Sequence, residues 1–168
     1  MPEVKKSVLP EWENRLQALL PEFGHRNWVV VADSAYPAQS KPGIETLVAG
    51  GGQMETLKKV RDAIAGCKHV RANVYVDREL AFVAEKDAPG VTEYRQQLHA
   101  AFSSACITYL PHEQIIARLD KSAEVFRILV IKTEMTIPYT SVFFELDCGY
   151  WNAEAEQRLR QAMPVAEL

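Results

Sequence analysis

The sequence predicts an α/β fold in which one mixed or mainly parallel sheet carries helices on both faces. Short apolar runs alternate along the chain with segments of helical periodicity, and this alternation is typical of α/β proteins. The run WVVVA at 28–32 is apolar throughout and has polar and turn residues on both sides, as expected of a strand buried on both faces. The chain length of 168 residues fits one hydrophobic core. We therefore expect a single domain over residues 1–168, with a C-terminal helical extension from about residue 152.

The expected strands are recognised by β-branched and aromatic residues, by alternation, or by short apolar runs between turn signals. The segment 33–43, which follows the first of them, carries two prolines and a glycine and is expected to be a loop. The predicted strands are residues 28–32, 44–52 (a short strand with a glycine turn), 69–80, 106–110, 125–132 and 139–148.

The expected helices show apolar residues at spacings of three and four. In the first of them Trp12, Leu16 and Leu19 share one face, and Gly24 is placed to terminate the helix. Asn152 is expected to cap the last helix, since a side-chain oxygen there can accept a backbone N–H of the first turn. The predicted helices are residues 10–22, 53–67, 90–105, 111–122 and 152–163.

The net charge of −3 gives no field that would recruit nucleic acid or acidic lipid. No apolar run approaches the roughly 20 residues needed to span a bilayer, and the N-terminus lacks the apolar stretch of a secretory signal. The three cysteines are far apart and form no CxxC pair, which favours reduced thiols. We expect a cytoplasmic protein whose partner is a small neutral molecule or another protein, with no nucleic acid and no membrane.

Most familiar catalytic patterns are missing from the sequence. The four histidines show neither HxH nor HExxH spacing, so no metal site is expected. The glycines at 50–52 precede a helix but lack the P-loop lysine and the dinucleotide-binding pattern, and no serine lies in a GxSxG elbow. General acid–base chemistry remains, with His25 before the first strand and Asp33 after it as candidates. Taken singly, each of these two residues has an ordinary structural interpretation.

Several short motifs occur together in a fixed order along the chain. They are Gly24-His25, an apolar strand, ADSAYPAQS with Asp33, Pro37 and Ser40, then HEQ at 112–114, VIKTE at 130–134, and Pro138-Tyr139. In this order they resemble the D-ribose pyranase / L-fucose mutarotase family, over roughly residues 10 to 150. The resemblance implies the fold of that family and a mutarotase that interconverts ring forms of a free reducing sugar, fucose-like or ribose-like.

The resemblance also implies which residues do the work. His25 corresponds to the catalytic histidine of the family, and Asp33 to an aspartate that binds the sugar and takes part in catalysis. His112, Tyr139 and Ser141 correspond to further substrate-binding positions. Proteins of this family need no cofactor and no metal, bind a monosaccharide, and form homo-oligomeric rings, so a pentameric or decameric ring is expected.

The sequence departs from the family pattern at two of these motifs. The family's Tyr-x-Asn ends here in Ser141, which offers one donor where an amide offers two, and Asn27 stands where family members usually have aspartate. The segment around 70–80 and the tail beyond Trp151 also fit the pattern poorly. Two alternatives therefore stay open: a non-catalytic sugar-binding or regulatory protein on the same oligomeric scaffold, and a structural subunit whose assembly is its function.

The residues suit sugar ring opening, but their spacing poses a geometric question. Opening the ring takes a proton from the anomeric hydroxyl and delivers one to the ring oxygen, and a histidine can do either at neutral pH. His25 and Asp33 are eight residues apart, about 25 Å in an extended chain. Either the chain folds back at 24–27, or the loop 33–43 reaches around, or a neighbouring subunit completes the site. We expect the last, with Tyr139 supplied by the neighbouring chain.

Overall fold

The computed structural model describes residues 8–103 and 106–165 and contains one mixed six-stranded sheet, in the order β2-β5-β1-β6-β3-β4. The strands β1, β2, β3, β4 and β5 run parallel to one another, and β6 alone is antiparallel, between β1 and β3. The strands are β1 (Trp28–Ala32), β2 (Ile44–Val48), β3 (Val70–Asp77), β4 (Ile107–Leu110), β5 (Ile128–Lys132) and β6 (Val142–Cys148). The predicted α/β class with a mixed sheet is confirmed.

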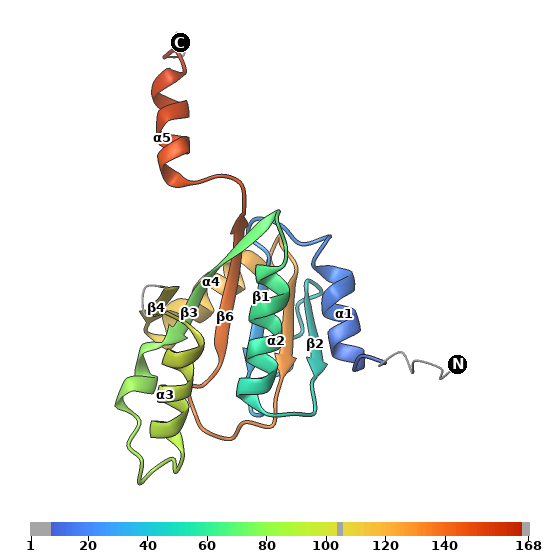
Figure 1. Cartoon of the computed structure of the whole chain (residues 1–168), viewed down its shortest axis with the longest axis vertical. Coiled ribbons are helices and arrows are strands. Elements are labelled where there is room, and N and C mark those ends of the chain that lie inside the picture. The colour runs from blue at the N-terminus through green and yellow to red at the C-terminus, as the bar shows by residue number, and fades with distance from the viewer. Residues whose placement is uncertain (1–7, 104–105, 166–168) are drawn as a thin grey trace, which may run out of the picture.

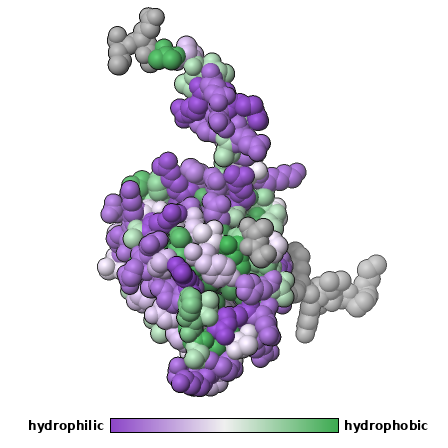
Figure 2. Space-filling view, turned by 90° about the vertical axis from the view of Figure 1, so that its left-hand side faces the viewer, coloured by the Kyte–Doolittle hydropathy of each residue, from purple (hydrophilic) through white to green (hydrophobic). Residues whose placement is uncertain are grey.

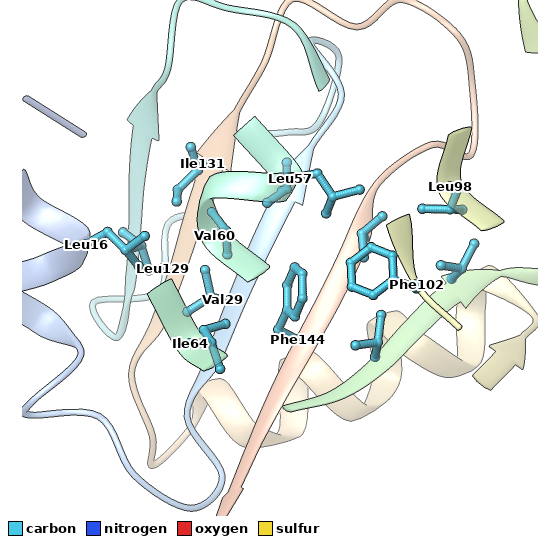
Figure 3. Packing of buried hydrophobic residues seen from close by; sticks show 14 of the residues in the cluster. Leu16, Val29, Leu57, Val60, Ile64, Leu98, Phe102, Leu129, Ile131 and Phe144 are labelled. Atoms are coloured by element: carbon cyan, nitrogen blue, oxygen red, sulfur yellow. The ribbon is translucent and has the colours of Figure 1, made fainter. Parts of the chain in front are cut away.

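Helices cover both faces of the sheet (Figure 1). On one face α1, α2 and α3 pack on the sheet, and Figure 3 shows Leu57 and Val60 of α2 above Val29 and Phe144. On the other face α4 packs through Ile115. The helices are α1 (Glu11–Leu19), α2 (Gln53–Ala65), α3 (Val91–Ala101), α4 (His112–Ala123) and α5 (Ala153–Ala162), with a 3₁₀ turn η1 (Arg78–Phe82) after β3.

The strand β1 lies at the centre of the sheet and is buried on both sides, as the apolar run predicted. Val29 and Val31 point into the core under α1, α2 and α3, and Trp28 and Val30 point into the core under α4. Side chains alternate in this way because successive residues of a strand face opposite sides of the sheet. A strand with helices on both sides must therefore be apolar at every position.

Several predicted element ends differ from the structure. The strands predicted over 125–132 and 139–148 begin three residues later, at Ile128 and Val142. The first helix ends at Leu19, before Gly24, because Pro21 has no N–H to continue the helical hydrogen bonds. The strand predicted over 69–80 ends at Asp77 and passes into η1. The helix predicted over 90–105 ends at Ala101, and residues 104–105 lie outside the described residues. The predicted cap of the last helix is confirmed, since Asn152 Oδ1 accepts the Ala155 N–H at 2.8 Å.

The topology gives the sheet two edges of different character. At the carboxyl edge the parallel strands end and β6 begins, so Asp33, Asp77 and Ser141 meet there. At the amino edge the parallel strands begin and β6 ends, so His25 lies there, and α5 stands beyond this edge (Figure 1). Open α/β sheets bind ligands outside the carboxyl ends of their strands, so a ligand site is expected at the carboxyl edge. Across residues 8–103 and 106–165, no helix combines the length and apolarity that crossing a bilayer requires.

Candidate functional site

A hollow of about 360 Å³ lies at the carboxyl edge of the sheet. Its volume falls within the range of about 300–1,000 Å³ that is usual for small-molecule sites. Its polar and aromatic lining comprises Asp33, Tyr36, Gln39, Asp77, His112, Tyr139 and Ser141. We call this the aspartate pocket. One chain therefore brings together four of the five predicted site residues, all except His25.

Asp33 and Ser141 are joined by two hydrogen bonds. The Ser141 hydroxyl donates to Asp33 Oδ1 at 3.0 Å and accepts the Asp33 backbone N–H at 3.1 Å. Ser141 is only 3% exposed, so its hydroxyl proton is committed to the carboxylate beside it. The serine thus fixes the Asp33 carboxylate at the floor of the pocket, with its other oxygen available as an acceptor.

His112 is held by two carboxylates at the start of α4. Its Nδ1 lies 3.0 Å from Asp77 Oδ1, and its backbone N–H donates to both oxygens of Glu79. With Nδ1 protonated toward Asp77, the lone pair on Nε2 is left for a second partner. Sequence reasoning did not single out Asp77. The available signal was a buried run, VYV, that ends in an acidic residue at the carboxyl edge.

The Asp77 carboxylate is almost fully buried, with 1% of its side chain exposed. This burial raises the pKa of Asp77 to about 6, and the negative charges of Glu79 and Asp33 act in the same direction. The hydrogen bond and the charge of His112 oppose the shift. The pocket therefore contains a carboxyl that exchanges a proton close to neutral pH, adjacent to an imidazole.

Tyr139 stands at the mouth of the pocket in a left-handed backbone conformation, with φ of 61°. Its ring meets the His112 ring edge-on, with centroids 5.9 Å apart. The next residue anchors the turn, because the Thr140 carbonyl accepts hydrogen bonds from buried Tyr94 and Gln53 at 2.6 and 2.9 Å. A bulky residue rarely adopts this conformation, so the flanking contacts hold it in place. Tyr139 lies beside His112 and shares the aspartate pocket with Asp33 of the same chain, so these three residues meet without a neighbouring chain.

Tyr36 is a pocket residue that the sequence analysis passed over as part of a turn. Its burial raises its pKa to about 12, assisted by the charges of Asp120, Asp77 and Asp33. Its hydroxyl is buried and has no hydrogen-bond partner among the described residues. A buried polar atom without a partner is unusual in a folded protein.

His25 lies at the amino edge, separated from the aspartate pocket by the length of β1, which is roughly 16 Å for five residues. Its side chain is 57% exposed, and its Nδ1 lies 2.8 Å from Asp147 Oδ1. Burial would raise the pKa of Asp147, but hydrogen bonds from the Cys148 N–H, Arg71 and His25 outweigh it and lower the pKa. A carboxylate that accepts from Nδ1 orients the ring, and Nε2 has no hydrogen-bond partner within residues 8–103 and 106–165.

Asn27 has a structural role in the turn that carries His25. Its Oδ1 accepts the Gly24 N–H at 2.8 Å, and its Nδ2 donates to the Arg127 carbonyl at 3.1 Å. Arg26, which lies between His25 and Asn27 in this turn, has a positive φ of 77°. These two hydrogen bonds of Asn27 hold the turn at 24–27 in place, and His25 lies on that turn.

The aspartate pocket combines carboxylate acceptors, an imidazole and two tyrosines, which is a set suited to a polyhydroxyl compound. Among the described residues, no three histidine, cysteine or carboxylate side chains lie close enough together to share a metal ion. Acid–base chemistry at hydroxyl groups is what these side chains can perform.

Known proteins share the sequence profile and the fold of this chain. The sequence profile of the RbsD / FucU transport protein family matches residues 8–148. No protein with a curated description matches the chain. Among solved structures, Bacillus subtilis RbsD complexed with D-ribose has a TM-score of 0.55 and 22% identity, covering 83% of this chain and 94% of its own. The fucose mutarotase of Streptococcus pneumoniae in complex with L-fucose has a TM-score of 0.52 and 20% identity, covering 88% and 98%.

Proposed function

The chain belongs to the RbsD / FucU transport protein family, and we propose from this that it is a monosaccharide mutarotase, which interconverts ring forms of a free reducing sugar. The observation that carries the proposal is the aspartate pocket, where Asp33, His112 and Tyr139 surround a hollow of sugar size. The buried hydroxyl of Tyr36 adds a polar group that a sugar hydroxyl would satisfy. Two solved structures of the same fold are complexes with D-ribose and L-fucose, which favours a monosaccharide as the ligand here too.

The reaction needs one proton removed and one delivered. A base takes the proton of the anomeric hydroxyl, the bond between C1 and the ring oxygen breaks, and an acid protonates the ring oxygen to give the open-chain aldehyde. Closure on the other face of the carbonyl reverses each transfer, so no atom or electron is gained or lost and no cofactor is required. Each positioned acid or base contributes about 10²–10⁴-fold.

The two transfers call for two acid–base groups, and we assign them to His25 and to the Asp77–His112 pair. Each histidine has one nitrogen oriented by an aspartate, Asp147 or Asp77, and its other nitrogen makes no hydrogen bond to any residue that the structure describes. They lie at opposite edges of the sheet, so one chain cannot bring both to the same sugar. A second copy placed with its amino edge on the carboxyl edge of the first would do so.

Such a contact is head-to-tail, and a repeated head-to-tail contact closes into a ring when the rotation allows it. Charge favours it. The hollow around His25 contains three arginines, Arg26, Arg71 and Arg160, against two carboxylates, whereas the aspartate pocket holds Asp33 and Asp77. We therefore propose a homo-oligomeric ring in which each sugar site is shared between neighbours.

Within this site, we propose that Asp33 holds the sugar hydroxyls and that Ser141 positions Asp33. This assignment differs from a direct sugar contact by Ser141, because the serine proton is already used by the carboxylate. It also motivates the alternative function, a sugar-binding protein without turnover, since the second donor of the family's asparagine is missing at this position.

The test is proton NMR of anomeric exchange with catalytic amounts of protein and a panel of ribose, fucose, galactose and rhamnose. We expect faster exchange for one sugar, lost in Asp33→Asn and kept in Asp62→Asn, whose aspartate is exposed on α2. Saturable broadening of a sugar signal without faster exchange would support the binding protein instead. A folded protein that neither binds nor accelerates any sugar of the panel would refute both functions.

A further inference from the structure

We infer that the C-terminal helix α5 is an arm that lies in an apolar groove on the next copy of this chain. The inference rests on the proposed function to the extent that it uses the same head-to-tail contact between copies. It adds a partner surface to that contact, formed by residues beyond the matched family segment, which ends at residue 148.

The helix α5 has no buried residue and stands clear of the body in both views (Figures 1 and 2). Its apolar side chains Ala155, Leu159, Ala162 and Met163 fall at helical spacing on one side, and Gln157 lies on the other. A helix of ten residues has marginal stability in water by itself. The apolar side therefore needs a surface to cover it.

The root of α5 shares a hollow with His25 at the amino edge of the sheet. Tyr150, Trp151 and Glu156 line this hollow together with His25 and Asp147. The Trp151 Nε1–H donates to Glu156 at 2.7 Å, which fixes the first turn of α5 to the segment that leads into it. A neighbouring copy that contacts His25 must therefore also contact the first turn of α5.

A receiving groove is formed where the chain leaves the carboxyl edge of the sheet through η1. It has a volume of about 380 Å³ between η1, α3 and β4, and its lining includes Leu80, Phe82, Leu98 and Tyr109. Phe82 is 75% exposed at the rim of this apolar groove, and Figure 2 looks onto this side of the molecule. Within η1, Arg78 directly follows Asp77 of the aspartate pocket. The groove and the pocket are thus one residue apart along the chain, within reach of a helix about 15 Å long on a neighbour that places His25 in the pocket.

We assign a second copy of this chain to the groove, because one head-to-tail contact would cover both the apolar side of α5 and the apolar groove. The apolar side of α5 and the apolar groove lie at opposite edges of the same chain, as a head-to-tail contact requires. The excess of arginine around the root of α5 faces the carboxylates of the aspartate pocket in the same arrangement.

The test is disulfide cross-linking between copies of the full-length chain. Leu159→Cys is combined with Phe82→Cys in a Cys106→Ser background, because Cys106 is exposed. The matched control combines Leu159→Cys with Val125→Cys, whose valine is 78% exposed and lies away from the groove. Under mild oxidation we expect the Phe82 pair to give covalent multimers on a non-reducing gel, and the Val125 pair to stay monomeric.

Absence of cross-links in the Phe82 pair, or equal linking in both pairs, would overturn the inference. A second measurement compares Leu159→Glu with Gln157→Glu, which put the same charge on opposite sides of α5. We expect the first to raise the concentration at which the oligomer dissociates at least tenfold, and the second to leave it unchanged; equal effects would contradict the arm. Neither cross-linking nor oligomer dissociation requires catalysis. Cross-linking without accelerated sugar exchange would therefore refute the proposed mutarotase function and leave the inference about α5 standing.

Discussion

Replacement of Asp77 by asparagine tests the electrostatics of the aspartate pocket. The pKa of Asp77 is raised from 3.8 to about 6, mainly by burial. A pKa unit corresponds to about 1.4 kcal/mol, so ionising this carboxyl in the folded chain costs about 3 kcal/mol relative to the unfolded chain. Asparagine has nearly the same shape, can accept the His112 Nδ1–H bond, and does not ionise.

Proton linkage gives the direction in which the free energy of unfolding changes with pH. Between pH 4 and pH 6 the folded chain keeps the proton on Asp77 and the unfolded chain has released it, so stability falls as pH rises through this window. Between pH 4 and pH 7.5 the free energy of unfolding of Asp77→Asn should therefore rise by about 2.5 kcal/mol relative to that of the wild type.

The assay is urea unfolding at a series of pH values and one protein concentration, since the stability of the proposed oligomer would depend on concentration. Asp62→Asn, on the surface of α2, serves as the control and should follow the wild type at every pH. Parallel curves for the wild type and Asp77→Asn would refute the buried, proton-retaining carboxyl.

Three further substitutions test individual contacts of the account. Ser141→Ala removes the donor to Asp33 and should lower kcat/KM for anomeric exchange roughly tenfold, with circular dichroism unchanged; full activity would show that Asp33 needs no such support. Tyr36→Phe removes a partnerless buried hydroxyl, so the sugar-free protein should melt at the same or a higher temperature while sugar affinity falls by calorimetry; unaltered affinity would exclude a contact with the sugar. Gly149→Ala would place a Cβ 2.7 Å from a backbone carbonyl and should lower the free energy of unfolding by about 1–3 kcal/mol, whereas Gly24→Ala has open space; equal stability would contradict the packing.

The fold was predictable because each element has a strong local pattern. The run at 28–32 is apolar at every position, which requires helices on both faces, and that is what the structure has. Element ends were less predictable, because they depend on single residues. Pro21 stops the first helix before the expected glycine, and Asp77 ends β3 as the backbone turns into η1.

The site was predictable to the extent that it is contiguous with recognisable motifs. Asp33, His112 and Tyr139 were expected to act together and do share one pocket. Asp77 and Tyr36 were missed because their roles arise from burial beside other segments, which no local motif records. The spacing of His25 and Asp33 did raise the question of a site shared between copies, but the residue placed apart by the structure is His25 and not Tyr139.

The claim that a shared site accelerates anomeric exchange is tested most directly by mixing two inactive variants. His25→Ala and Asp33→Asn are each expected to lose activity, and equal amounts are assembled together from dissociated subunits. In a head-to-tail ring, about a quarter of the sites then pair a native His25 with a native Asp33. The control mixture combines His25→Ala with the double variant, which supplies no native pair on either side.

We predict that anomeric exchange by NMR returns to about a quarter of the wild-type rate in the first mixture and not in the control. Exchange in the first mixture no faster than the sum of the separate variants would contradict a site shared between copies.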